Sequence, residues 1–358
     1  MIATHLKFLI NNFLKSFIYV FFIMLSLVIV LNILNEVEFF KDKNVNSFFP
    51  FYVSILNSSD YIFQMYPFIF LLTTQVFFIN LFDNNQIHIF KYSGLKNSKI
   101  MAIISVTSFI LGIIIITLFY SLSSNLKNIY LEIKNEFSND NKYLAVITNN
   151  GLWIKDIINS EIRIVNASKI DNDFLIDVFI SEFDQNYDLK RNINSEKVNI
   201  QNNEWLIYNP KIYENNEVQS VESLKIFSNF DYERIQNLFS NLSSLSLIEL
   251  ISLRNDYKQI NYSTTEIDLQ LQKLFSFPLY FTLMTILSGI IMFNTKNFKS
   301  ISLKLTIGLF LCVVIYYVNN FFYVLGDTEK IPLYASVWLP LLILFLINTK
   351  LIIKINEK

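Results

Sequence analysis

Residues 17–34 read FIYVFFIMLSLVIVLNIL, and this uncharged run decides the class of the chain. A helix needs about 20 apolar residues to cross the hydrocarbon core of a bilayer, with a range of about 17–25. Five later stretches are also uncharged and of similar length: 61–82, 100–122, 274–293, 305–325 and 331–349. The sequence therefore predicts six membrane-spanning helices in two groups of three.

Composition agrees with a membrane protein. The chain has 358 residues, of which 53% are hydrophobic and only 16% are charged. Soluble domains carry about 25% charged residues. The first run exceeds the 7–15 apolar residues of a signal peptide, and Asn35 and Glu36 follow it without a small-residue cleavage site. We therefore expect a retained span rather than a cleaved leader.

Charge predicts the orientation of the spans. If the N-terminus is cytoplasmic, the cytoplasmic segments carry eleven lysines against two acids, Asp83 and Glu357. The short loops on the other side carry six acids against Lys41, Lys43 and Lys330. By the positive-inside rule, both termini are then cytoplasmic and the long segment 125–272 is extracytoplasmic.

The segment 125–272 has a different character from the spans. It holds 14 Lys and Arg against 22 Asp and Glu, so it would repel nucleic acid, whereas the rest of the chain holds 15 against 8. Short runs rich in β-branched and aromatic residues alternate with Asn, Asp and Ser turns, and Asn149-Asn150-Gly151 is a hairpin signal. The runs are 143–148, 152–156, 162–165, 174–180, 198–200, 205–208 and 223–227. Helices are expected on both flanks, at 125–141 and 245–273.

The predicted fold is thus an α-helical membrane protein with six transmembrane helices and an inserted antiparallel β-domain, a sandwich or open barrel. Its expected parts are transmembrane helices at 1–124, a β-domain with flanking helices at 125–272, and transmembrane helices at 273–358.

Several kinds of chemistry have no motif in the chain. The six glycines form neither a phosphate-binding GxxxxGK[ST] loop nor GxGxxG. His5, His88 and Cys312 cannot assemble a Cys/His metal site, and no GxSxG or HExxH occurs. No ionisable residue lies within the six uncharged runs, which leaves a proton relay without a carrier. We expect no catalytic residue, no metal site and no cofactor in this chain.

Four local motifs, in this order, resemble one known family. They are NGLWIKD at 150–156, SLIEL at 246–250, LQKLFSFP at 271–278, and Ile331-Pro332 followed by Ala335, Trp338 and Pro340. Together with the layout of spans, they resemble the LptF/LptG family of lipopolysaccharide export permeases over essentially the whole chain. The Gly-Leu-Trp element is more similar to LptG than to LptF.

The resemblance implies a β-jellyroll-like periplasmic domain and a function in the bacterial inner membrane. A permease of this kind takes lipopolysaccharide from the inner membrane and passes it through the periplasmic domain towards the outer membrane. ATP and Mg²⁺ are bound by a separate LptB-like ATPase dimer. An LptF-like permease as heterodimer partner, an LptC-like subunit and membrane lipids are the other expected partners.

The same resemblance implies two sets of site residues. A short coupling helix near 84–94, between the second and third spans, would dock on the ATPase, with Gln86 where the family usually has an acid. A neutral bond from Gln86 is about half as strong as a charge-assisted one. Gly94 suits a helix C-cap that requires positive φ. The expected coupling residues are Gln86, Ile87, Ile89, Phe90, Lys91, Tyr92, Ser93 and Gly94.

Lipid contacts are expected at the outer end of the first span and in the β-domain. Asn32 stands where LptG-type chains often carry a lysine, and Lys41 and Lys43 could replace that charge towards lipid phosphate or simply reach the membrane interface. Acyl chains would lie in the β-domain interior against aromatic residues that could equally be ordinary core. These are Trp153, Phe174, Phe179 and Trp205.

Two other classes of function stay open from the sequence. One is a permease for another lipid or a lipoprotein, for which a four-span layout is common. The other is a membrane-anchored sensor or scaffold whose β-domain binds a ligand, which would need no cytoplasmic partner at Gln86–Gly94.

Overall fold

A computed structural model describes residues 4–137, 152–158, 161–171, 173–184, 187–214, 217–232, 235, 241–259, 263–296, 298 and 300–353. The chain divides into two compact units. The first contains residues 1–127 and 265–358, and the second contains residues 128–264. Each unit is described by itself.

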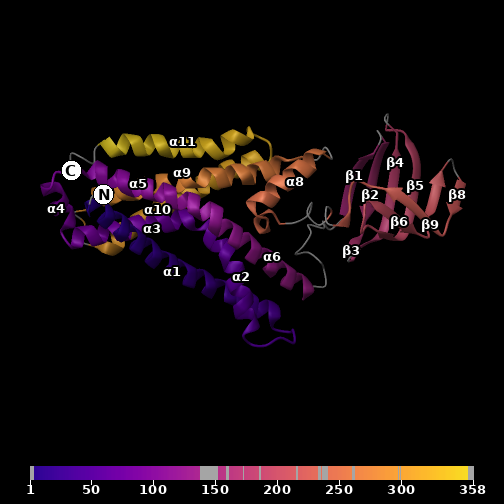
Figure 1. Cartoon of the computed structure of the whole chain (residues 1–358), viewed down its shortest axis with the longest axis horizontal. Coiled ribbons are helices and arrows are strands. Elements are labelled where there is room, and N and C mark those ends of the chain that lie inside the picture. Colours follow the sequence, from indigo (N-terminus) through magenta and orange to yellow (C-terminus); the bar gives the residue numbers. More distant parts are fainter. Residues whose placement is uncertain are drawn as a thin grey trace. The chain divides into compact units, whose positions relative to one another are not determined.

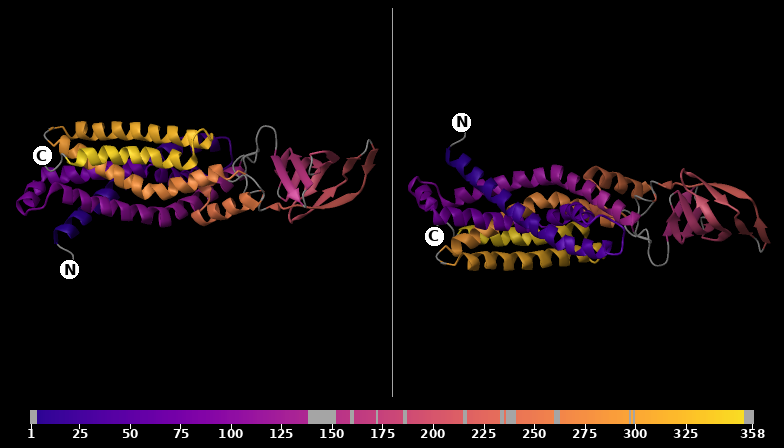
Figure 2. Two further views of the ribbon diagram at one scale, coloured as in Figure 1. Left: turned by 90° about the horizontal axis from the view of Figure 1, so that it is seen from above. Right: turned by 90° about the horizontal axis from the view of Figure 1, so that it is seen from below.

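The first unit is helical, and its long helices run side by side (Figures 1 and 2). Its elements are α1 Thr4–Phe40, α2 Phe49–Gln64, α3 Tyr66–Asp83, α4 Gln86–Tyr92, α5 Asn97–Ile114, the π-helix η1 Ile115–Phe119, the start of α6 Tyr120–Glu136, α9 Thr265–Asn294, α10 Ile301–Asp327 and α11 Leu333–Ile352.

Six stretches of this unit are long and apolar enough to cross a membrane, as predicted. They are α1, α3, the continuous α5–η1–α6 stretch, α9, α10 and α11. The start of α1, the short helix α4 and the end of α11 lie at the same end of the unit (Figure 1). These three segments, which all carry lysines, therefore lie together at one end of the helical unit.

One span begins later than predicted. The run at 61–82 is divided at Met65, where α2 ends and α3 begins. Pro67 lies in the first turn of α3, where its missing N–H costs no helical hydrogen bond. The helix α2 itself was not predicted, because Ser54, Asn57 and Asp60 make its sequence polar.

Helix α9 forms the centre of the bundle. Most residues in the apolar stretch of α9 are buried, and the helix packs against α3, α5, α10 and α11. Phe281 of α9 stacks on Phe70 of α3 with ring centroids 4.9 Å apart. The ring centroid of Phe277 lies 5.4 Å from that of Phe63 of α2. Helices α1 and α10 bury far less of their apolar surface, which leaves large faces for lipid or a partner helix.

The described residues of the second unit form nine antiparallel strands in one hydrogen-bonded sheet (Figure 1). The main path is β1-β2-β4-β5-β6-β9, while β3 pairs with β4, and β7 pairs with β5 and β8. The strands are β1 Leu152–Ile158, β2 Glu161–Ala167, β3 Lys169–Asp171, β4 Phe174–Phe183, β5 Leu189–Asn199, β6 Glu204–Tyr208, β7 Lys211–Glu214, β8 Glu217–Ser220 and β9 Ser223–Phe227.

An inserted antiparallel β-domain is therefore present, as predicted. The run at 143–148 and the hairpin signal at 149–151 lie outside the described residues. The strands β3, β7 and β8 were missed, and β5 begins nine residues before its predicted run at 198–200. The flanking helical segment is α8 Leu247–Gln259, preceded by the 3-10 turn η2 Leu242–Ser244 and followed by α9.

Candidate functional site

The short helix α4 connects α3 to α5 and carries the predicted coupling residues. It ends in a Schellman motif, in which Leu95 N–H donates to the Phe90 carbonyl at 2.9 Å and Gly94 N–H donates to the Lys91 carbonyl at 3.0 Å. Gly94 has φ 81°, so the predicted left-handed C-cap is confirmed. A non-glycine residue would be strained there.

The side chains of α4 divide between two faces. Ile87 is buried, and Phe90 is half-buried with its ring 5.9 Å from that of Phe8 on α1. On the opposite face, Ile89 is 63% exposed and Tyr92 is 91% exposed. Because positions i and i+3 of a helix are neighbours, Ile89 and Tyr92 form one apolar surface directed away from the bundle.

The other members of the predicted set lie at the ends and edges of α4. Gln86, in its first turn, is half-buried, and Lys91 is exposed in its last turn. The Ser93 hydroxyl donates to the Phe90 carbonyl at 2.8 Å, so Ser93 closes the helix together with Gly94. The eight residues therefore comprise an inner group that positions α4 and an outer group available to a partner.

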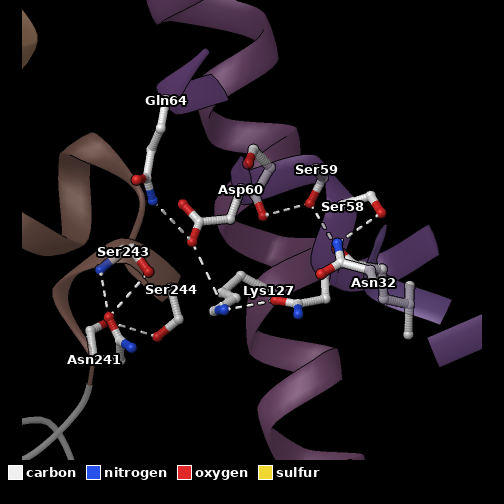
Figure 3. Close-up of polar contacts among 12 residues, drawn as sticks. Asn32, Ser58, Ser59, Asp60, Gln64, Lys127, Asn241, Ser243 and Ser244 are labelled. Carbon is white, nitrogen blue, oxygen red and sulfur yellow. Dashed lines mark hydrogen bonds and ion pairs between the residues drawn. The ribbon is translucent and has the colours of Figure 1, made fainter. Parts of the chain in front are cut away.

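A second cluster lies between α1, α2 and α6 (Figure 3). Asn32 is buried, and its Nδ2 donates to the Ser58 hydroxyl at 2.9 Å. Lys127 Nζ donates to Asn57 Oδ1 at 2.7 Å and lies 3.7 Å from a carboxylate oxygen of Asp60. The structure thus places Asn32 in an interhelical hydrogen bond rather than on an exposed surface.

Sequence reasoning did not identify Lys127 as a member of this cluster. Its only signal in the sequence is its position five residues after the apolar run 100–122, at the start of segment 125–272. Once buried, its ammonium requires hydrogen-bonding partners, and α2 supplies them from Asn57 and Asp60. The hydrogen bond and ion pair of Lys127 therefore connect the end of the third span to α2.

Lys41 and Lys43 follow the end of α1. Lys41 is exposed, and the Lys43 ammonium lies 3.6 Å from the centroid of the Phe39 ring. This cation–π contact orients one lysine along the end of the helix. The placement of both lysines just after α1 is compatible with either phosphate contact or interfacial snorkelling.

The four aromatic candidates of the β-domain do not come together. Trp205 is fully buried, and its Nε1 donates to the Phe230 carbonyl at 2.6 Å within the hydrophobic core. Trp153 and Phe179 flank Asn166 in one row across β1, β2 and β4, and they are 55% and 42% exposed. Phe174 is half-buried under the Lys197 ammonium, which lies 3.7 Å from its ring centroid.

Charged side chains form a row across the same sheet. The registers align Asp156, Arg163, Glu182 and Arg191 on neighbouring strands. Arg163 Nε and Arg191 Nε lie 2.8 and 2.5 Å from the two oxygens of Glu182. The hydrogen bond that Arg191 donates to Glu182 raises the pKa of the Arg191 guanidinium above its usual value. This row forms a polar boundary beside the apolar core.

Asp156, the last residue of the NGLWIKD motif, has a structural partner that the motif alone did not reveal. Its carboxylate accepts hydrogen bonds from the Ser228 hydroxyl at 2.9 Å, from Asn229 Nδ2 at 2.8 Å and from Asn229 N at 3.2 Å. The buried acid therefore fixes the chain after β9 to β1. Among the residues that the structure describes, no group of His, Cys, Asp and Glu could hold a metal ion.

The sequence matches the model of a known protein family. The protein family described as lipopolysaccharide export system permease LptF/LptG matches residues 7–354. No curated protein matches the chain. Because the match covers the six candidate spans, α4 and the β-domain alike, the chain belongs to the LptF/LptG family of lipopolysaccharide export permeases.

Proposed function

We propose that this chain is the permease subunit that extracts lipopolysaccharide from the inner membrane and passes it through its β-domain towards the outer membrane. The family match over residues 7–354 is the observation that carries the proposal. The six spans, the outward-facing α4 surface and the inserted β-domain supply the parts that such a subunit needs.

Energy comes from a separate ATPase in this proposal. An LptB-like dimer binds ATP and Mg²⁺ and docks on α4 from the cytoplasm. The lysine distribution in the sequence supports a cytoplasmic position for α4. Contact through Ile89 and Tyr92 transmits movement to α1, because the inner face of the same helix packs on Phe8.

Further subunits complete the transporter. The chain acts as the LptG-type half, as its Gly-Leu-Trp element suggests, and pairs with an LptF-like permease. The sparsely buried α1 and α10 provide apolar surface for that contact and for the lipid. An LptC-like subunit receives the lipid from the β-domain, which is periplasmic in this arrangement.

Purification from the native membrane tests the proposal. The full chain, carrying an affinity tag, is expected to bring with it an ATPase dimer and a second six-span chain in stoichiometric amounts. Two results together would overturn the proposal: isolation of the chain without either partner, and normal lipopolysaccharide export in cells depleted of the chain. The sensor or scaffold alternative predicts that second result.

A further inference from the structure

A cavity of about 180 Å³, lined by both apolar and polar side chains, lies in the helical unit between α9, α10 and α11. Gln64 of α2 and Pro67 of α3 complete its wall. Its principal polar lining residues are Lys273, Tyr280, Asn319, Asn320 and Tyr323. None of the described residues that line it is Asp or Glu, so the cavity offers many donors and one positive charge.

Lys273 supplies the charge. Its Nζ lies 5.2 Å from the centroid of the Tyr323 ring, and within the described part of the chain it forms no ion pair. Asp60 acts on it electrostatically but is in contact with Lys127 instead. An ammonium inside a helical membrane bundle is costly without an anionic partner, and the cavity next to it is large enough to hold one.

Tyr280 supplies a donor that lacks a partner. The residue is 7% exposed, and within the described residues its hydroxyl makes no hydrogen bond of ordinary geometry, although the Asn319 side chain interacts with it. A buried hydroxyl left without a hydrogen bond costs free energy. An anion held by Lys273 would accept this hydrogen bond as well.

Pro67, a lining residue, lies at the start of α3, whereas α4 follows the end of α3, so the cavity lies near the end of the unit opposite α4. Lys273 is about two turns from the start of α9, and Tyr323 is about one turn from the end of α10. Ser336, another lining residue, lies in the first turn of α11. Side chains at this depth are level with the head groups of the leaflet on that side.

We propose that this cavity binds a phosphate group, supplied by an anionic membrane phospholipid. A cavity of about 180 Å³ is smaller than the roughly 300–1,000 Å³ typical of drug-sized ligands, so it admits a head group rather than a whole lipid. Phe277, Val337 and Leu341 line the apolar part of the wall and suit the glycerol and upper acyl carbons. The site goes beyond export of lipopolysaccharide and needs only that the bundle lies in a bilayer.

Lipid retention by the full chain, together with the partners that purify with it, tests this site. The protein is reconstituted in vesicles of equal parts phosphatidylglycerol and phosphatidylcholine, extracted again in detergent, and its bound lipids are counted by native mass spectrometry. We expect selective retention of phosphatidylglycerol. Lys273→Ala is expected to reduce that retention about tenfold, the effect of losing a hydrogen bond to a charged group, whereas Lys273→Arg retains it.

Two further variants separate binding from folding. Lys330→Ala removes an exposed lysine that does not line the cavity, and it should retain the lipid fully. Tyr280→Phe should lower retention without unfolding the protein, because the hydroxyl binds the ligand and little else. If no anion binds, Tyr280→Phe removes only an unsatisfied hydroxyl, and retention stays unchanged.

A second arm identifies the source of the phosphate. Inorganic phosphate is added to protein in phosphatidylcholine alone, and the melting temperature is followed. A rise in the wild-type protein that Lys273→Ala abolishes, without retention of phosphatidylglycerol, would support the site with free phosphate as its ligand. Equal retention of both lipids in all variants, with no response to phosphate, would overturn the proposal and leave a water-filled cavity. None of these outcomes depends on export activity.

Discussion

The ring of Phe90 in α4 packs against the ring of Phe8 in α1, with their centroids 5.9 Å apart. This contact ties the segment between the second and third spans to the first span. It also assigns Phe90 to the inner face of α4, so the outer face is formed by Ile89 and Tyr92. Under the proposed function, docking and transmission would therefore use different residues of a seven-residue helix.

The first prediction concerns docking on the outer face. Ile89→Asp and Tyr92→Ala should each weaken ATPase association about tenfold or more, because exposed aromatic and aliphatic anchors carry most interface energy. Gln86→Ala is the matched control on the same helix and should change the association less than about threefold, since the neutral amide of Gln86 could offer a partner only neutral hydrogen bonds. The amount of ATPase purified with the tagged chain measures both. A larger loss with Gln86→Ala than with Tyr92→Ala would contradict the division of faces.

Phe90 should behave differently from its exposed neighbours. Phe90→Ala removes packing against Phe8, so we expect ATPase to remain bound while its hydrolysis loses coupling to lipid release. The ratio of ATP hydrolysed to lipopolysaccharide released by the reconstituted complex measures this effect. An unchanged ratio would show that α1 receives no movement through this contact.

The second cluster predicts energetic coupling between α2 and α6. Lys127→Met leaves the Asp60 carboxylate buried without its nearest cation, which should cost about 1–3 kcal/mol of stability. Adding Asp60→Asn should recover part of that loss, since the unpaired charge is gone. Thermal unfolding of the wild type, both single variants and the double variant measures the coupling. Strictly additive changes would mean that the pair does not stabilise the bundle.

Close packing at Gly112 predicts an asymmetry between two glycines. A Cβ atom at Gly112 would lie 2.8 Å from the Cα atom of Pro278, whereas one at Gly289 would first meet the flexible thioether of Met101. Alanine favours a helix by about 1 kcal/mol over glycine at either position. Gly112→Ala should nevertheless destabilise the protein by about 1–3 kcal/mol through overpacking, while Gly289→Ala should be close to neutral. Equal melting temperatures for the two variants would refute the backbone contact.

Asp156 predicts a local weakness in the β-domain. Asp156→Ala leaves the Ser228 hydroxyl and the Asn229 amide groups without their acceptor, which should cost about 1–3 kcal/mol. Protease cleavage after β9 in the full chain should become faster. Glu196→Ala, an exposed acid on β5, is the control and should leave the cleavage rate unchanged. Comparable cleavage in both variants would remove the proposed role of the motif.

The spans were predictable because a bilayer imposes a length on apolar runs, and all six runs have helices as expected. The helix α2 was not, because its buried residues include the polar Ser54, Asn57, Ser58 and Asp60 as well as apolar ones. Their partners, Asn32 and Lys127, lie far away in sequence. Such polar contacts between helices leave no local pattern for a single sequence to display.

The β-domain was predictable in kind but not in detail. Most of β5 is polar, because its side chains join the charged row or face outwards, so only its apolar end at Val198 gave a strand signal. In β4, Leu175 and Val178 are both buried although they are three residues apart, and Asp177 between them has φ 50°. This interruption changes the alternation of faces along β4, which is why its two aromatic candidates, Phe174 and Phe179, could not be assigned to a face from the sequence.

The fate of lipopolysaccharide after depletion of this chain tests the central claim most directly. Newly made lipopolysaccharide is labelled, the chain is depleted, and the label is measured in separated inner and outer membranes. We predict that the label accumulates in the inner membrane, that the intact chain restores delivery, and that the Ile89→Asp chain does not. Normal delivery to the outer membrane in the absence of the chain would contradict its assignment as the export permease.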